Sequence, residues 1–330
     1  MAMKSDAGGR RRRGLWFAVT PVIAVVLVAV VAVVVHNDRH MAAANKAAFQ
    51  HPTTTTREPK LTTTTPSPTP TTTEPPFTPT TPQNQVLINQ AVGAVDALQF
   101  KGVTFGVAIE DRVSGQVTGG ANSATPFYAA SVVKLFTVTY LLHQQEVGAL
   151  TLGQGMMDLI PRALELSDDN AEDAFWSTYG GVSLIPKFVA LFGLQNTIPP
   201  PDPAQWGETK FSADDVLRVY DFAINKLDPD DVAIVMGDLG QAADTGADGF
   251  DQAFGLLAPP RMDNVKAKQG WMEIIGDSMT LNSTGVLGSD NDFLIAIMSK
   301  QPVDIGWAEG ESRMNAAAEI VEKVLSPAIG

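Results

Sequence analysis

Residues 129–135 read Ala129-Ala130-Ser131-Val132-Val133-Lys134-Leu135 and lead into a strongly apolar stretch. This pattern predicts a helix over residues 131–147. Positions three apart share a helix face, so the Lys134 ammonium can reach the Ser131 hydroxyl. A helix that begins at Ser131 also aims free backbone N–H groups at that hydroxyl. Lys134 stands among apolar neighbours, where a charge without a function is costly, so the pair indicates a serine nucleophile with a lysine base.

Histidine is scarce in the part of the chain that can fold. His143 is the only histidine in residues 84–330, because the other three lie within the first 51 residues. It would stand three turns beyond Ser131 on the same helix, which is out of hydrogen-bond reach. A Ser-His-Asp triad and a histidine-ligated zinc site are therefore excluded, and we expect His143 at a surface or helix end.

The sequence of the N-terminal quarter predicts a membrane anchor followed by a stalk. Segment 1–13 ends in four arginines, and residues 14–35 form an uncharged apolar run long enough to cross about 30 Å of hydrocarbon. The positive-inside rule then predicts a single-pass protein of the cytoplasmic membrane, with its N-terminus inside and residues 84–330 outside as one folded domain. Residues 36–83 are rich in Thr and Pro and predict an extended stalk. A signal peptide cut near Met41–Ala44 is the alternative.

The amino-acid composition excludes several classes of function. The 330 residues carry a net charge of −13 and include no cysteine. Disulfides, thiol catalysis, cysteine-ligated metals and the lipid-bearing cysteine of a lipoprotein anchor are thereby excluded. The acidic charge argues against a nucleic-acid partner. No cofactor or metal is implied.

Residues 84–330 show the element pattern of an α+β domain. Helices are predicted over residues 84–98, 131–147, 159–176, 183–191, 213–226 and 312–324, and strands over residues 103–110, 116–119, 268–275, 279–287 and 292–298. Ser212 is the expected cap of the helix that begins at residue 213. Strands at both ends with helices between predict a mostly antiparallel sheet with a helical insertion.

Two further motifs accompany the serine and lysine pair. Ser167-Asp168-Asp169-Asn170 lies in the helical block, and Lys268-Gln269-Gly270-Trp271 opens a predicted strand. The three motifs resemble the Ser-x-x-Lys, Ser-Asp-Asn and Lys-Thr-Gly signature of class A β-lactamases and penicillin-binding proteins. Residues 100–325 thus resemble the class A β-lactamase-like serine hydrolases of bacterial envelopes, and the match includes Ala174-Phe175-Trp176, Gly180-Gly181, Trp206-Gly207 and Asp251-Gln252-Ala253-Phe254-Gly255.

The resemblance implies a β-lactamase/transpeptidase-like fold and a role for each motif. Ser131 would be the acylated nucleophile, Lys134 its base, and Ser167 the group that relays a proton to the leaving nitrogen. Lys268 would hold a substrate carboxylate and support Ser167, and the backbone N–H groups of Ser131 and Trp271 would form the oxyanion hole. The short interval from Ser131 to Ser167 implies a reduced helical insertion and a more open cleft.

Two substrate-binding positions depart from the family pattern. Asp169 stands where the family has asparagine, unless a local shift brings Asn170 there instead. A carboxylate can only accept hydrogen bonds and would favour the charged form of Lys134. Gln269 replaces the usual hydroxyl residue before Gly270, which removes a small donor to a substrate carboxylate.

Deacylation in this family uses a glutamate on a loop, and Glu208 is the only carboxylate near that place. The residues around Glu208 do not match the usual loop. Without such a base, an acyl-enzyme would form and then hydrolyse slowly.

Plainer interpretations of the same motifs exist. The acidic residues after Ser167 could be a solvated helix end or, less readily, a calcium site. Lys266 and Lys268 could be ordinary edge-strand charges, Trp271 could be core, and the Ser131 and Lys134 spacing could be chance. Two functions follow: a serine hydrolase acting on β-lactams or D-alanyl cell-wall peptides, or a catalytically silent domain that binds cell-wall peptide or a protein partner.

Overall fold

The computed structural model of the chain describes residues 82–274, 276 and 278–329. They lie in the second of two compact units, Glu74–Gly330. The predicted cytoplasmic segment, the predicted span at residues 14–35 and nearly all of the predicted stalk lie outside the described residues.

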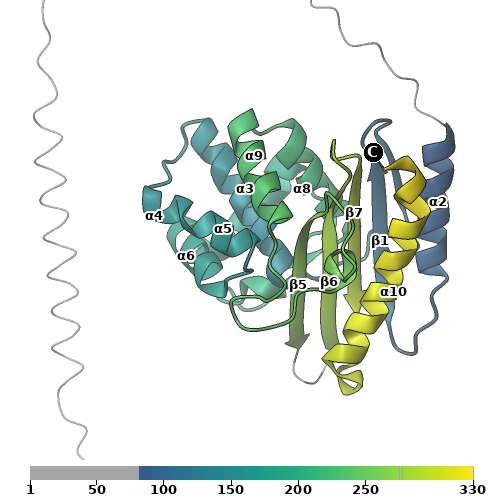
Figure 1. The fold of residues 1–330 in the computed structure, drawn as a ribbon. Helices are drawn as coiled ribbons and strands as arrows, with labels where there is room; N and C mark the ends of the chain where they lie inside the picture. Colours follow the sequence, from purple (N-terminus) through teal and green to yellow (C-terminus); the bar gives the residue numbers. More distant parts are fainter. Residues whose placement is uncertain (1–81, 275, 277, 330) are drawn as a thin grey trace, which may run out of the picture. The chain divides into compact units, whose positions relative to one another are not determined.

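A five-stranded antiparallel sheet forms the middle layer (Figure 1), with the strand order β2-β1-β7-β6-β5. The strands are β1 (Thr104–Asp111), β2 (Gln116–Gly119), β5 (Lys266–Ile274), β6 (Ser278–Leu287) and β7 (Phe293–Lys300). Strand β1 pairs with β7 along its whole length, from Thr104 opposite Lys300 to Asp111 opposite Phe293. The two ends of the domain therefore share one sheet, and the predicted α+β class is confirmed.

Helices cover both faces of this sheet (Figure 1). One face carries α2 (Pro82–Asp96) and α10 (Trp307–Leu325). The other face carries the helical insertion, which consists of α3 (Val133–Glu146), α4 (Gln154–Met157), α5 (Leu159–Leu164), α6 (Asp169–Tyr179), α7 (Leu184–Phe192), α8 (Ala213–Asn225) and α9 (Pro229–Gly240).

Strand β7 separates two hydrophobic cores because its side chains alternate between the faces. One set packs toward the helical insertion and consists of Leu294, Ala296 and Met298. The other packs toward α2 and α10 and consists of Phe293, Ile295 and Ile297. All six are fully buried, which explains why β7 reads as a continuous apolar run.

Short elements connect the insertion to the sheet. They are β3 (Phe127–Tyr128), the 3₁₀ turn η1 (Ala130–Val132), the 3₁₀ turn η3 (Trp206–Glu208) and β4 (Lys210–Phe211). Phe136 of α3 stacks on Phe211 with the ring centroids 3.7 Å apart. Strands β3 and β4 pair, so the chain around Ser131 is fixed to the segment that precedes α8.

The helix predicted over residues 159–176 is two helices, and the break between them bears on function. Helix α5 ends at Leu164 and α6 begins at Asp169. Ser167 adopts a left-handed φ of 54°, which a continuous helix cannot accommodate. Asp168 then caps α6 by accepting the Asn170 N–H at 3.0 Å. The break leaves Ser167 in the turn rather than on a helix face.

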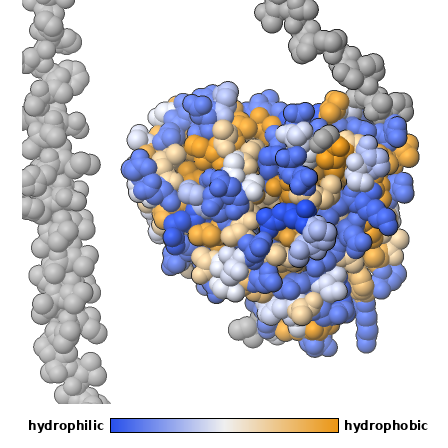
Figure 2. Space-filling view, viewed as in Figure 1, coloured by the Kyte–Doolittle hydropathy of each residue, from blue (hydrophilic) through white to orange (hydrophobic). Residues whose placement is uncertain are grey.

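Other boundaries follow local signals. Ser212 caps α8 as expected, since its hydroxyl accepts the Asp215 N–H at 3.1 Å. Helix α9 was not predicted, although Asp228, Pro229 and two acidic residues form a recognisable helix start. Helix α10 begins at Trp307, five residues before the predicted start. On the face in Figure 2, hydrophobic side chains form small areas separated by hydrophilic ones.

Candidate functional site

Ser131 sits in a tightly held turn between β3 and α3. Its side chain is almost buried, with 5% of the residue exposed. Ala130 before it has a φ of 45°, a strained value for a residue with a side chain. The Ala129 N–H donates to the Thr209 carbonyl at 2.8 Å, and the Asn282 amide donates to the Ala129 carbonyl at 3.1 Å. These bonds hold the turn that presents the hydroxyl.

Lys134 lies directly beside Ser131. The Lys134 Nζ is 2.6 Å from the Ser131 Oγ and 2.8 Å from the Asp169 Oδ1. It also stands over the Trp206 ring, 4.3 Å from the ring centroid. The lysine side chain is fully buried, whereas 62% of the Asp169 side chain is exposed. The predicted pair is thus brought together from two adjacent short helices, η1 and α3.

Burial decides the direction in which the Lys134 pKa moves. Loss of hydration is the largest cause and lowers the pKa of Lys134 below its ordinary value. The charge and hydrogen bond of Asp169 act in the opposite direction without cancelling the shift. Because water surrounds most of the Asp169 side chain, its charge is partly screened. The environment therefore favours the neutral amine that a base requires.

Ser167 and Lys268 form a second hydroxyl and amine pair. The Lys268 Nζ donates to the Ser167 Oγ at 2.7 Å and to the Gln269 carbonyl at 3.1 Å. Only 1% of Lys268 and 4% of Ser167 are exposed. Burial lowers the pKa of Lys268 well below its ordinary value, and the charge of nearby Lys134 lowers it further. Both pairs follow the sequence prediction in their contacts.

Asp169, and not Asn170, faces Lys134. The Asn170 amide turns back to the Asp168 carboxylate at 3.0 Å, and Asn170 is exposed outside the cleft. The reason is local: Asp168 is the cap of α6, which aims the next residue at Lys134 and the one after it toward the cap. The motif is Ser-Asp-Asp, and the expectation that Asn170 contributes a substrate contact is not supported.

Strand β5 supplies the third motif, with its side chains divided between two faces. The Gln269 amide donates to the Phe254 carbonyl in the interior and does not reach the cleft. Gly270 permits close packing on η1, since a Cβ there would meet the Ala129 carbonyl oxygen at 2.7 Å. Trp271 does line the cleft. The interior hydrogen bond of the Gln269 side chain gives no support to the predicted substrate contact.

Ser131 opens onto a cleft of about 670 Å³, which we call the Ser131 cleft. Lys134, Ser167 and Lys268 are not among its lining residues. Its walls come from η1, α6, η3, β5, the start of α10 and the loop before η4 (Gly255–Leu257). The lining residues are Ala130, Ser131, Asp169, Asp173, Ala204, Gln205, Trp206, Gly207, Asp248, Phe250, Trp271, Met272, Glu273 and Trp307. Glu208 is not among them, so its predicted place as a base for the deacylating water is not supported.

Sequence reasoning missed several residues of this region. Glu172 is fully buried under Lys134, with its Oε1 bonded to the Thr137 hydroxyl at 2.7 Å, and burial raises its pKa to about 7. Asn282 holds the Ser131 turn from β6. Asp248 accepts the Trp271 indole N–H at 3.0 Å. Asn282 is one of several polar residues in β6, so nothing in the sequence singled it out, and no signal marked the other two.

His143 lies in the last turn of α3, as expected. Its ring is packed edge-on against Phe222, with the centroids 5.1 Å apart, and its Nδ1 is 3.3 Å from the Glu146 carboxylate. It does not line the Ser131 cleft.

The fold is similar to that of class A β-lactamases and related proteins. One is PBP-A, with a TM-score of 0.57, 16% identity, and coverage of 73% of this chain and 96% of PBP-A. Another is a class A β-lactamase representative from Bacteroides cellulosilyticus, with a TM-score of 0.59, 14% identity, and coverage of 73% and 99%. The predicted β-lactamase/transpeptidase-like fold is thereby confirmed.

Relatives in sequence correct the predicted location. No protein-family model matches the chain. Proteins named "Putative lipoprotein LppW" from Mycobacterium tuberculosis and Mycobacterium bovis are 36% identical over 214 residues, which are 64% of this chain and 68% of each relative.

Lipoproteins are anchored by lipid, and the relatives' name therefore overturns the prediction of a single-pass protein of the cytoplasmic membrane. Among the described residues, no helix is long and apolar enough to cross a membrane. A lipoprotein carries its lipid on a cysteine, and this chain contains no cysteine. At this identity and coverage, the chain belongs to the LppW family.

Proposed function

We propose that the protein is a serine acyl-transfer enzyme in which Ser131 forms a covalent acyl-enzyme with β-lactams or D-alanyl cell-wall peptides. One observation carries this proposal: the fully buried Lys134 amine is 2.6 Å from the Ser131 hydroxyl oxygen. A desolvated lysine in hydrogen-bond contact with a serine is a competent general base.

In the acylation step, Lys134 in its neutral form takes the proton from the Ser131 hydroxyl. The Ser131 Oγ forms a bond to the substrate carbonyl carbon, and the carbonyl oxygen becomes an oxyanion. We expect backbone N–H groups of Ser131 and Trp271 to stabilise this charge, because both residues line the cleft and β5 is an edge strand of the described sheet.

Collapse of this intermediate breaks the bond between the carbonyl carbon and the leaving nitrogen. That nitrogen needs a proton, which Ser167 can deliver from its hydroxyl. The charged form of Lys268 then replaces this proton across the 2.7 Å contact and becomes neutral, a change that its lowered pKa favours. The positive charge left on Lys134 is balanced by Asp169 at 2.8 Å. Asp169 therefore stabilises the charged Lys134 after proton transfer, although the same negative charge disfavours neutral Lys134 before it.

Deacylation requires water activated by a second base. Glu208 does not line the Ser131 cleft, and Asp169 is already paired with Lys134. We therefore propose that the acyl-enzyme is long-lived, as in penicillin-binding proteins. One structural neighbour, a PBP-A variant, is described as an acyl-enzyme complex with penicillin G, which supports this kind of intermediate for the fold.

The hypothesis of a catalytically silent binding domain has weaker support. Four groups, Ser131, Lys134, Ser167 and Lys268, keep two short hydroxyl and amine contacts, at 2.6 and 2.7 Å, beneath an open cleft. Burying two amines is costly, and a domain that only bound a ligand would gain nothing from it.

The test is intact-mass spectrometry of the purified protein incubated with a penicillin or with a depsipeptide that ends in D-alanine. A lasting mass increase in the wild type that Ser131→Ala loses is the expected result. Ser123→Ala, at a serine outside the cleft, is the matched control and should keep the adduct. Absence of an adduct and of substrate consumption with every donor would contradict the proposal.

A further inference from the structure

The Ser131 cleft is strongly acidic. Its lining includes four carboxylates, and none of the described residues that line it is a lysine or arginine. The carboxylates are distributed around the opening, and they are Asp169 and Asp173 of α6, Asp248 of the loop before η4, and Glu273 of β5. A cleft lined by one sign of charge concentrates ligands of the opposite sign.

The two lysines beneath the cleft do not offset this charge toward a ligand. Lys268 is 1% exposed, and its amine is engaged by Ser167 and the backbone. Lys134 is fully buried and paired with Asp169. Burial lowers the pKa of both lysines, which reduces their positive charge. An acidic side chain added to a substrate would therefore meet carboxylates in the cleft, with no lysine or arginine among the lining residues to balance it.

Aromatic rings form a continuous wall on the β5 side. Phe250 stacks on Trp271, with the centroids 4.8 Å apart and the planes at 11°. Trp307 meets Phe250 edge-on at 5.1 Å. Asp248 fixes this cluster, because it accepts both the Trp271 indole N–H at 3.0 Å and the Phe250 backbone N–H at 2.9 Å. Carboxylates beside electron-rich rings suit an ammonium or guanidinium group.

The wall that contains Trp206 already holds an amine in this manner. The Trp206 ring lies under the Lys134 amine at 4.3 Å, and its indole N–H donates to Asp173 at 2.8 Å. Trp271 with Asp248 repeats this tryptophan and aspartate pairing across the cleft. In the second pair, no lysine or arginine of the lining faces the rings.

We propose that the Ser131 cleft selects acyl donors that carry a positive charge, with an ammonium or guanidinium group held between Asp248, Glu273 and the wall of Phe250, Trp271 and Trp307. This inference rests on the proposed acyl transfer at Ser131. It assigns the substrate class as a cationic acyl donor, such as a peptide ester or amide with a basic side chain. Because β-lactams and D-alanyl peptides already carry a carboxylate, the favoured donors among them are those with an added basic group, and the disfavoured donors are those with a further acidic group.

The test compares three thioester acyl donors built on one peptide, in which a single side chain is lysine, acetyl-lysine or succinyl-lysine. Ser131 displaces the thiol in each, so the donors share one reaction and differ in a single side chain, which is cationic, neutral or anionic. The expected order of kcat/KM is cationic, neutral, anionic, with about tenfold at each step at low salt and less at high salt. Equal rates, or a faster anionic donor, would overturn the inference.

The Glu273→Gln variant removes one charge with little change in size. It should lower the ratio of cationic to anionic kcat/KM by about fivefold. Asp221→Asn, a surface carboxylate on α8 outside the cleft, is the matched control and should leave that ratio unchanged. A ratio that falls equally in both variants would mean that overall charge, and not the cleft, sets the preference, and would overturn the inference.

A binding measurement separates this inference from the proposed function. Unreactive amide analogues of the three peptides are titrated into Ser131→Ala, with tryptophan fluorescence as the signal. Tighter binding of the cationic amide without acylation of the wild type would uphold the cleft's selectivity and remove the proposed reaction. Acylation by all three thioesters at one rate, with equal binding of the amides, would uphold the reaction and remove the selectivity.

Discussion

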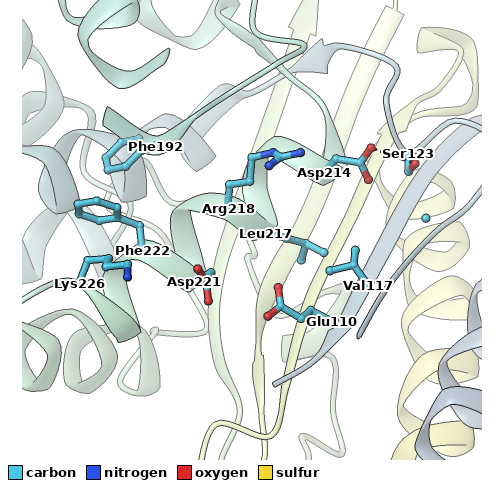
Figure 3. A pocket seen from close by; sticks show the side chains of 11 residues that line it. Glu110, Val117, Ser123, Phe192, Asp214, Leu217, Arg218, Asp221, Phe222 and Lys226 are labelled. Atoms are coloured by element: carbon cyan, nitrogen blue, oxygen red, sulfur yellow. Dashed lines mark hydrogen bonds between the residues drawn. The ribbon is translucent and has the colours of Figure 1, made fainter. Parts of the chain in front are cut away.

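The Ser131 cleft and a groove beside α8 are hollows of similar size with different chemistry. The second, which we call the α8 groove, has a volume of about 720 Å³, against about 670 Å³ for the cleft. Figure 3 shows its side chains: Phe192, Phe222 and Lys226 lie at one end, and Asp214 and Ser123 at the other. Its further lining residues are Glu110, Val117, Gly119, Leu217, Arg218 and Asp221.

Each hollow contains a serine, but the serines have different partners. The Ser123 hydroxyl donates to the Asp214 carboxylate at 3.2 Å. Ser131 instead contacts a buried amine. The α8 groove holds its cations, Arg218 and Lys226, in the lining, where water screens them. The volumes of the two hollows do not distinguish them. The buried amine in contact with the Ser131 hydroxyl does.

Replacing Lys134 should give the largest loss. Lys134→Arg keeps a positive charge but cannot give up its proton, so acylation of Ser131 should fall by about 10²- to 10⁴-fold. Stopped-flow or intact-mass time courses would measure the rate. Lys226→Arg in the α8 groove is the matched control and should acylate at the wild-type rate. Equal rates in the two variants would place the base elsewhere.

Glu172 should make the stability of the folded domain depend on pH. Burial raises the pKa of Glu172 to about 7, so the folded state binds this proton more tightly than the unfolded state. The stability gained from this proton is complete below about pH 4.5 and is lost as the pH rises through 7. The loss is on the order of 3 kcal/mol.

Urea unfolding between pH 5 and 8 should show a shallower decline for Glu172→Gln than for the wild type. Glu110 of the α8 groove offers a comparison, because its pKa is also raised to about 7, mainly by burial. Glu110 is only partly buried, so Glu110→Gln should flatten the curve less. If stability declined with pH as steeply in Glu172→Gln as in the wild type, the Glu172 carboxyl would not be the cause of the decline.

Gly270→Ala should destabilise the Ser131 turn. The added Cβ would stand 2.7 Å from the Ala129 carbonyl oxygen and 3.2 Å from the Val132 nitrogen, which are backbone atoms that cannot move independently. We expect a loss of about 1–3 kcal/mol in the free energy of unfolding. Gly237→Ala in α9, where a Cβ would meet nothing within 4 Å, should be neutral or stabilising.

Asp169→Asn should give the smallest change, as a shift in pH dependence. Acylation requires neutral Lys134, so its rate rises with pH through the lysine pKa. Asp169 raises that pKa, and its removal should move the rise to lower pH. Asp221→Asn should leave the profile in place, and a shift to higher pH in Asp169→Asn would contradict the assignment.

Much of the site could be predicted from short motifs, and the limits of that prediction are physical. Ser131 with Lys134 was found because helix periodicity brings residues three apart together. Ser167 with Lys268 needed the resemblance, since 101 residues separate them. Whether Asp169 or Asn170 faces Lys134 depends on the left-handed backbone conformation at Ser167. Serine has no preference for that conformation, so the sequence did not predict it.

The cleft's walls were harder to predict than its centre. Phe250 and Asp248 lie on an irregular loop, and Trp307 precedes the predicted start of the last helix. Their meeting depends on tertiary packing between segments far apart in sequence. The interior position of the Gln269 side chain has a simpler reason: the side chains of a strand alternate, and its neighbour Lys268 already faces Ser167.

The most direct measurement uses a small, uncharged fluorophosphonate, whose reaction forms an Oγ–P bond at an activated serine and releases fluoride. Because the probe has no charge, the result does not depend on the acidic lining of the cleft. Peptide mapping by mass spectrometry should locate the label on Ser131, with Ser123 unlabelled, and Lys134→Arg should abolish the label. An unlabelled Ser131, or equal labelling of Ser131 and Ser123, would contradict the central claim that the buried Lys134 activates this serine.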